Sequence, residues 1–307
     1  MNDSASSGSD PTAAVGALVD AELATPVAAP VRAVATAARE RHGAAVLAVL
    51  FYGSCYRDGA TEGALVDLYL IVDRYRRVHR RLWSTFANAL LPPNVYYVET
   101  EHEGRKVRAK YAVVSLRQFA RLTGAGTLNP YFWARFAQPT GLVWVRDGKV
   151  RRQVRAALVR AIVTSYRAAR PLVRDPGDPL AVWRRAFRES YRTELRVEKP
   201  ERARRIVARF DDRYRRLSEL LERLPAPATS AAACARRWRL RRIQGKLLSV
   251  LRLIKAAFTF RGGAEYLAWK IERHSGVPLP LTPWQKRHPI LAAVSLGWRL
   301  HRLRVIR

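Results

Sequence analysis

The stretches LFYGS, residues 50–54, and VDLYLIVD, residues 66–73, decide the fold of this chain. The first closes an apolar run, residues 44–52, which predicts a buried strand that stops at Gly53-Ser54. The second is an apolar run with Asp67 near its start and Asp73 at its end. A buried Asp is costly unless it has a partner. Glycine lets a backbone approach a phosphate, and a helix N-terminus favours anions, so this pattern predicts a phosphate site.

This order of elements resembles the start of nucleotidyltransferases of the DNA polymerase β superfamily. The resemblance implies an α+β fold, in which a polymerase β-like domain with a mixed sheet and helices precedes a mostly helical, winged-helix-like domain and C-terminal amphipathic helices. One position departs from the superfamily, because Tyr69 stands where a second Asp or Glu is expected. The alternatives are an ordinary strand-to-helix turn at Gly53-Ser54 and a structural Asp67 that pairs with an arginine.

Further motifs resemble one family of this superfamily, the mitochondrial-type phosphatidate cytidylyltransferases, also called translocator assembly and maintenance proteins. In chain order these motifs are Val66-Asp67 with Val72-Asp73, Val95-Tyr96-Tyr97, Lys110–Ser115, Tyr131–Arg135 with Gln138-Pro139, and Ser190–Arg196. Three places depart from the family, which has Gly, Gly and Gly-Asp where this chain has Ala112, Ala134 and Thr193-Glu194.

The resemblance implies transfer of a cytidylyl group from CTP to phosphatidic acid, with Mg²⁺ as cofactor and with CDP-diacylglycerol and pyrophosphate as products. It implies that Asp67 binds Mg²⁺, and Asp73 is a second candidate ligand. Six residues of straight strand span about 20 Å, so one metal ion cannot bind both. The other implied roles are triphosphate binding by Gly53 and Ser54, charge neutralisation by Lys110 and Arg135, and closure of the nucleotide pocket by Tyr191, Glu194 and Arg196.

The chain is strongly basic, with 56 Lys and Arg against 25 Asp and Glu and a formal net charge of +31. Such a surface attracts polyanions, which leaves nucleic acid, anionic lipid or a nucleotide as candidate partners. The two cysteines, Cys55 and Cys234, support neither a disulfide framework nor a zinc site. The six histidines show no metal-ligand spacing.

The N-terminus has neither the arginines of a mitochondrial presequence nor the basic start and apolar core of a signal peptide. No run of 18 apolar residues predicts a membrane span. We therefore expect a bacterial cytoplasmic protein that binds peripherally to the cytoplasmic face of the inner membrane. The expected organisation is a largely disordered segment (1–30), a nucleotidyltransferase domain (31–150), a helical or winged-helix-like domain (151–235) and basic amphipathic helices (236–307).

Local patterns predict four strands and a series of helices. The strands are residues 44–52, 65–72, 94–100 and 107–115, with a hairpin at 101–105. The helices are 31–41, a short one from Ser54, 76–90, 116–123, 151–170, 180–195, 200–224, 236–260, 264–274 and 289–304, with a break at 171–179.

The C-terminal third suggests contact with an anionic membrane surface. The basic run 236–242 leads into apolar residues at helical spacing, and Trp298 lies among Arg299, Arg302 and Arg304. For the helix around 247–258 we favour packing in the core. For the last helix, with Trp298, Arg299 and Arg302, we favour membrane contact.

Two other classes of function stay open at this point. One is a related nucleotidyltransferase with nucleic acid or protein as acceptor, which the basic charge favours. The other is a catalytically weak binding protein of the same fold, which Tyr69 favours.

Overall fold

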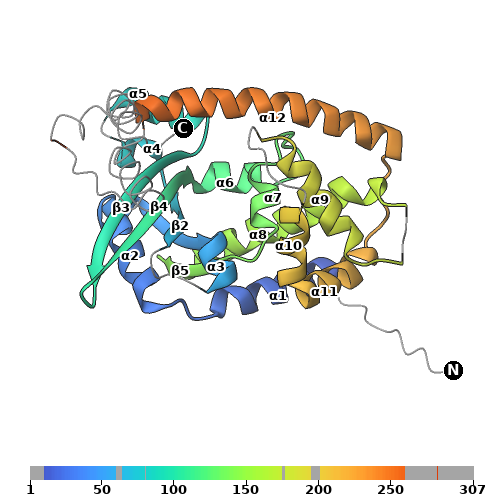
Figure 1. Cartoon of the computed structure of the whole chain (residues 1–307), viewed down its shortest axis with the longest axis horizontal. Helices are drawn as coiled ribbons and strands as arrows, with labels where there is room; N and C mark the ends of the chain where they lie inside the picture. The colour runs from blue at the N-terminus through green and yellow to red at the C-terminus, as the bar shows by residue number, and fades with distance from the viewer. Residues whose placement is uncertain are drawn as a thin grey trace, which may run out of the picture. The chain divides into compact units, whose positions relative to one another are not determined.

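The computed structural model in Figure 1 describes residues 10–59, 64–79, 81–174, 177–194, 201–259 and 282. Its contacts divide the chain into two compact units that alternate along the sequence. The helical unit comprises Met1–Pro26 and Ser115–Val250, and the sheet unit comprises Val27–Val114 and Leu251–Arg307. This division differs from the expected boundaries at residues 30, 150 and 235.

The sheet unit contains most of the strands. Its elements are α2 (Ala29–Glu40), β1 (Val46–Tyr52), α3 (Ser54–Asp58), β2 (Leu65–Val72), α4 (Tyr75–Val78), α5 (Leu82–Leu90), β3 (Asn94–His102) and β4 (Arg105–Ser115). The strand order is β3-β4-β2-β1-β5, where β5 is Gly141–Val145. Every residue of β1 is buried, as expected for a continuous apolar run in the interior of a sheet. The predicted α+β class is confirmed.

Two antiparallel pairings set the register of the sheet. β1 pairs with β2, which places Tyr52 opposite Asp67. β3 pairs with β4 in the long hairpin of Figure 1, which places Tyr97 opposite Lys110. The hairpin turns through Glu103 and Gly104, both with positive φ, as a two-residue turn requires to match the twist of the strands.

The predicted helix at residues 76–90 is two helices, α4 and α5. Between them His79 is buried, with Nδ1 3.1 Å from the Tyr96 hydroxyl and Nε2 3.0 Å from the Asn88 amide nitrogen. The Asn88 amide oxygen accepts a hydrogen bond from the backbone N–H of Asn94. This buried network fixes the start of β3 against α5, and one continuous helix would not place His79 there.

The helical unit is built around one long central helix. Its elements are α1 (Pro11–Ala24), α6 (Leu116–Leu122), α7 (Trp133–Phe136), α8 (Gly148–Ala169), α9 (Ala181–Tyr191), α10 (Glu201–Arg209), α11 (Asp211–Glu222) and the first part of α12 (Ala231–Thr259). Helix α8 contacts α1, α6, α7 and α9. The N-cap Asp147 begins α8 by accepting a hydrogen bond from the Val150 N–H, and this bond lowers the pKa of Asp147.

Large aromatic side chains fill the core of the helical unit. Trp183 lies 5.1 Å from Tyr214 between ring centroids and donates a hydrogen bond to Ser218. Trp133 and Trp238 meet edge to face at 5.8 Å. Arg241 is buried against both of these indoles, and burial lowers its pKa to about 10. The described residues from Gly148 to Thr259 form helices and no strand. They therefore do not contain the strands that a winged helix would require.

The expected disorder of residues 1–30 is wrong for Pro11–Ala24, which form α1. Asp10 caps this helix by accepting a hydrogen bond from the Thr12 N–H, and Val15, Val19 and Leu23 are buried. The predicted helix at 200–224 is interrupted at Phe210 and forms α10 and α11. The predicted helices at 264–274 and 289–304 lie outside the described residues.

Candidate active site

Gly53 and Asp67 meet where β1 ends beside the start of β2. Gly53 has φ +90° and ψ −157°, a region of backbone space that is open essentially to glycine alone. A Cβ atom built on Gly53 would lie 2.6 Å from Asp67 Oδ2 and 3.0 Å from its Cβ. The glycine therefore satisfies two demands at once, a left-handed φ and a close approach of the backbone to a carboxylate.

Lys110 reaches the same carboxylate from β4, the strand next to β2 in the sheet. Its Nζ lies 2.9 Å from Asp67 Oδ1, and the two side chains are 30% and 19% exposed. The structure thus brings together the two predicted catalytic residues. Because both side chains are partly exposed, the pair can open when an ion arrives. Lys110 would then bind an anion, or Asp67 a cation.

Ser54 is exposed at the first position of α3, as predicted. Helix α3 has only five residues, so its dipole is small. The next residue, Cys55, is buried and donates to the Leu65 carbonyl at 3.2 Å. Burial, together with the negative charge of Asp67, raises the pKa of the Cys55 thiol. Cys55 therefore stays neutral and serves packing.

The metal donors around Asp67 are few. Tyr69 stands where the resemblance would place a second acidic residue. It is fully buried in β2, with its ring 5.1 Å from that of Tyr52, and is an aromatic core residue. Within the described ranges no group of three His, Cys, Asp or Glu side chains could hold a metal ion. Asp73 follows the far end of β2 and forms an ion pair of 3.2 Å with Arg77. Because β2 is continuous between them, Asp73 is not a second ligand for a metal at Asp67.

The remaining predicted pocket residues belong to the helical unit. Arg135 lies 3.8 Å from Glu194 and stacks over the ring of Tyr131 at 4.6 Å. Tyr191 lies under the guanidinium of Arg202, 5.6 Å from the ring centroid. Arg135 and Glu194 are thus brought together, and the roles assigned to them stay predictions. Arg196 lies outside the described residues, as do the predicted membrane residues Trp298, Arg299 and Arg302.

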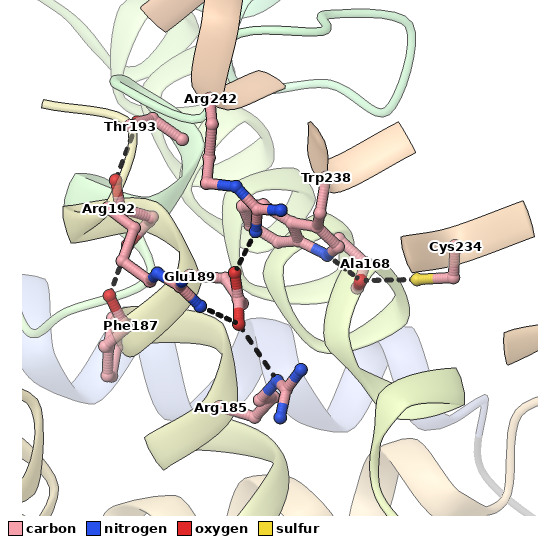
Figure 2. Close-up of polar contacts among 10 residues, drawn as sticks. Ala168, Arg185, Phe187, Glu189, Arg192, Thr193, Cys234, Trp238 and Arg242 are labelled. Atoms are coloured by element: carbon pink, nitrogen blue, oxygen red, sulfur yellow. Dashed lines mark hydrogen bonds and ion pairs between the residues drawn. The ribbon is translucent and has the colours of Figure 1, made fainter. Parts of the chain in front are cut away.

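Sequence reasoning missed the most heavily paired carboxylate of the helical unit. Figure 2 shows Glu189 of α9, which is 1% exposed, among three arginine side chains. Arg242 of α12 lies 2.9 Å from one carboxylate oxygen, and Arg185 and Arg192 lie 3.2 and 3.4 Å from the other. The spacings of four and three residues within α9 were a visible signal, because such residues share a helix face. Nothing in the local sequence indicated the distant partner Arg242.

Comparison with known proteins gives little that bears on the function of this chain. No family model matches the chain, and no curated protein matches it. Among the solved structures that match is a nucleotidyltransferase-like protein from Exiguobacterium sibiricum 255-15. It shares 13% sequence identity at a TM-score of 0.27, over 90% of this chain and 93% of that chain. Similarity this low leaves the activity of the chain to be inferred from its own residues.

Proposed function

We propose that this protein is a nucleotidyltransferase, and that it transfers a cytidylyl group from CTP to phosphatidic acid. The observation that carries the proposal is the contact of Lys110 with Asp67, 2.9 Å apart, beside a backbone that Gly53 keeps bare. The Lys110 ammonium can pair with the phosphates of a nucleoside triphosphate, and the Asp67 carboxylate can bind the Mg²⁺ that accompanies them. The choice of CTP and phosphatidic acid is supported by the sequence motifs alone.

The proposed chemistry asks for positioning rather than for a covalent intermediate. A phosphate oxygen of phosphatidic acid forms a bond to the α-phosphorus of CTP, and the bond from that phosphorus to pyrophosphate breaks. The attacking phosphate is already ionised near neutral pH, so no strong general base is required. Gly53 would admit the triphosphate close to the backbone, and Lys110 would neutralise charge on the phosphates.

Asp67 would hold Mg²⁺ in this proposal. One carboxylate is a sufficient protein ligand for Mg²⁺ only when substrate phosphates and water complete its coordination. Asp67 fits that case, because it is a single hard oxygen donor and is partly exposed. Bound there, Mg²⁺ would supply further neutralisation of phosphate charge. While no nucleotide is bound, Lys110 neutralises Asp67 and keeps its side chain in place.

The substitution Asp67→Asn tests the site. We expect a folded protein whose transfer of label from CTP to phosphatidic acid falls on the order of 10²-fold or more, as when one contact is removed from a preorganised site. Asp73→Asn is the matched control, since it makes the same change at the other end of β2 and should keep activity. Near-normal turnover of Asp67→Asn would refute the assignment. Competition by unlabelled ATP as strong as by CTP would refute the proposed nucleotide.

One alternative acceptor is favoured by a specific observation. A net charge of +31 suits nucleic acid as well as anionic lipid. The same assay with RNA in place of phosphatidic acid distinguishes them, because label would then appear in RNA. A protein that binds CTP and transfers label to neither acceptor would instead fit a binding role, in line with the buried Tyr69.

A further inference from the structure

Helix α12 carries a row of large apolar side chains that are exposed. Trp238, Arg241 and Lys255 of this helix are buried. The exposed row recurs at spacings of three and four residues, which is one face of a helix. Its members, each between 41% and 68% exposed, are Leu240, Ile243, Leu247, Val250, Leu251 and Ile254. The expected packing of residues 247–258 in a core is therefore wrong for Leu247, Leu251 and Ile254.

Helix α5 of the sheet unit carries a second exposed apolar group. Leu82, Trp83, Phe86 and Leu90 are between 58% and 75% exposed. The last turns of α12 belong to the same unit and are hydrogen-bonded to the loop that follows α5. Arg252 donates to the Pro92 carbonyl at 3.2 Å, and Lys255 donates to the carbonyls of Leu91 and Pro93. In Figure 1 α5 accordingly lies beside this end of α12.

Basic side chains accompany both apolar groups. Helix α12 contains no Asp or Glu. Arg236, Arg239 and Lys246 are exposed along it, at spacings that keep them beside the apolar row. The segment that leads into α5 has exposed arginines at 74, 76 and 81, and a further one, Arg77, is paired with Asp73. Apolar residues with aromatic members, bordered by Lys and Arg, are typical of helices that lie in the plane of a bilayer surface.

We propose that the exposed apolar face of α12, and separately that of α5, bind the surface of an anionic lipid bilayer. Charge complementarity selects this occupant, because the basic border would repel another copy of this basic chain and attracts acidic headgroups. On α12, Ile243 and Leu247 would enter the headgroup region, and Arg239 and Lys246 would contact the headgroup phosphates. On α5, Trp83 would enter the headgroup region in the same way. No single helix among the described residues is long and apolar enough to cross a membrane. The inference stands on exposed side chains and is independent of the proposed lipid substrate.

Flotation of the full chain with vesicles tests this surface. Vesicles of phosphatidylcholine with phosphatidylglycerol serve as the anionic probe, and pure phosphatidylcholine as the neutral one, so that binding of the proposed substrate plays no part. We expect flotation with the anionic vesicles only, and less of it at high salt. Ile243→Ser with Leu247→Ser, and separately Trp83→Ser with Phe86→Ser, should each lower vesicle affinity roughly tenfold.

Charge variants supply the matched control. Arg239→Glu with Lys246→Glu should abolish flotation, whereas Arg204→Glu with Arg205→Glu, an equal charge change at exposed positions of α10, should preserve it. The proposal is overturned if the apolar variants float as well as the full chain. It is also overturned if, without lipid, they convert a dimer into a monomer or lower the melting temperature by several degrees, because the face would then be covered by another copy or by the chain itself.

Discussion

Gly53 lies where any side chain would collide with Asp67. Two effects oppose a side chain here. A backbone at φ +90° is strained for other residues, and the added Cβ would lie 2.6 Å from the carboxylate. At Gly59 only the backbone strain applies, since its φ is +71° and nothing lies within 4 Å of a built Cβ. These two glycines, at the two ends of α3, therefore allow strain and contact to be measured apart.

We expect Gly53→Ala to lower the free energy of unfolding by about 3 kcal/mol and Gly59→Ala by about 1 kcal/mol. Chemical denaturation of both variants measures the difference. Equal losses would mean that Asp67 moves away freely, and that the close approach at Gly53 does not constrain the carboxylate.

The turn at Gly53 and the carboxylate at Asp67 were predictable from local sequence, because apolar runs bounded by Gly-Ser and interrupted by Asp are uncommon. The partnership of Asp67 with Lys110 was not. It depends on β4 lying next to β2, which is a non-local pairing that no single segment encodes. Asp73, equally conspicuous in the sequence, instead pairs locally with Arg77, four residues further along the chain.

Helices α9 and α12 are joined by the carboxylate of Glu189 and by close backbone contact. A Cβ on Gly245 of α12 would lie 2.6 Å from the Thr193 carbonyl oxygen, which leaves no room between them. The Glu189 carboxylate is buried, and it balances arginines from both helices whose own side chains are partly exposed. Removing one member of a buried ion network leaves uncompensated charge and is strongly destabilising.

Glu189→Gln should therefore lower the free energy of unfolding by about 3 kcal/mol. Glu219→Gln is the control, because its pair with Arg216 is exposed and its loss should change stability by about 0.5 kcal/mol or less. Denaturant titration of the two variants measures both changes in the free energy of unfolding. A loss for Glu189→Gln no larger than that for Glu219→Gln would show that the arginines reach water when the carboxylate is removed.

Lys255 of α12 should make the stability of the protein depend on pH. Burial, with the nearby Arg252 adding to it, lowers the pKa of Lys255 from 10.5 to about 7. Between these two pH values the unfolded chain binds a proton that the folded chain has released, so the stability contributed by Lys255 rises with pH. The rise is at most about 1.4 kcal/mol per pH unit and ends near pH 10.5.

Lys255→Met should remove this rise. The free energy of unfolding, measured for the full chain and the variant between pH 7 and pH 10, gives a difference that changes with pH only through Lys255. A constant difference would show that the Lys255 ammonium is as well solvated in the folded protein as in the unfolded chain.

For the molecule as a whole, helix α1 completes the helical unit. Asp20 of α1 pairs with Arg155 of α8 at 2.7 Å, and Glu22 pairs with Arg213 of α11. The composition of residues 1–30, mostly Ala, Ser, Gly, Pro and acidic residues, predicts disorder. The cap at Asp10 and the proline at the first helical position were readable signs of a helix start, but nothing local showed what α1 would pack against.

A chain that begins at Val27 should therefore be aggregated or melt far below the full chain, since burial of Val15, Val19 and Leu23 contributes about 1.5–3 kcal/mol for each side chain. A chain that begins at Asp10 keeps α1 with its cap and is the control. Thermal melting followed by circular dichroism compares them, and Val19→Asp in the full chain repeats the test without a deletion. Matching melting curves for all of these chains would mean that α1 packs without contributing stability.

The interleaving of the two units has a consequence for synthesis on the ribosome. Helix α1 is translated before its partners in α8 and α11, and the whole of β1 to β4 is translated between them. The sheet unit in turn waits for the last turns of α12 to reach the loop after α5. Neither unit can therefore be completed before most of the other has been translated, and β1 and β2, which are buried in the folded protein, lack part of their cover until then. The nascent chain is therefore expected to depend on chaperones that shield these strands, more than a protein whose units follow one another in sequence.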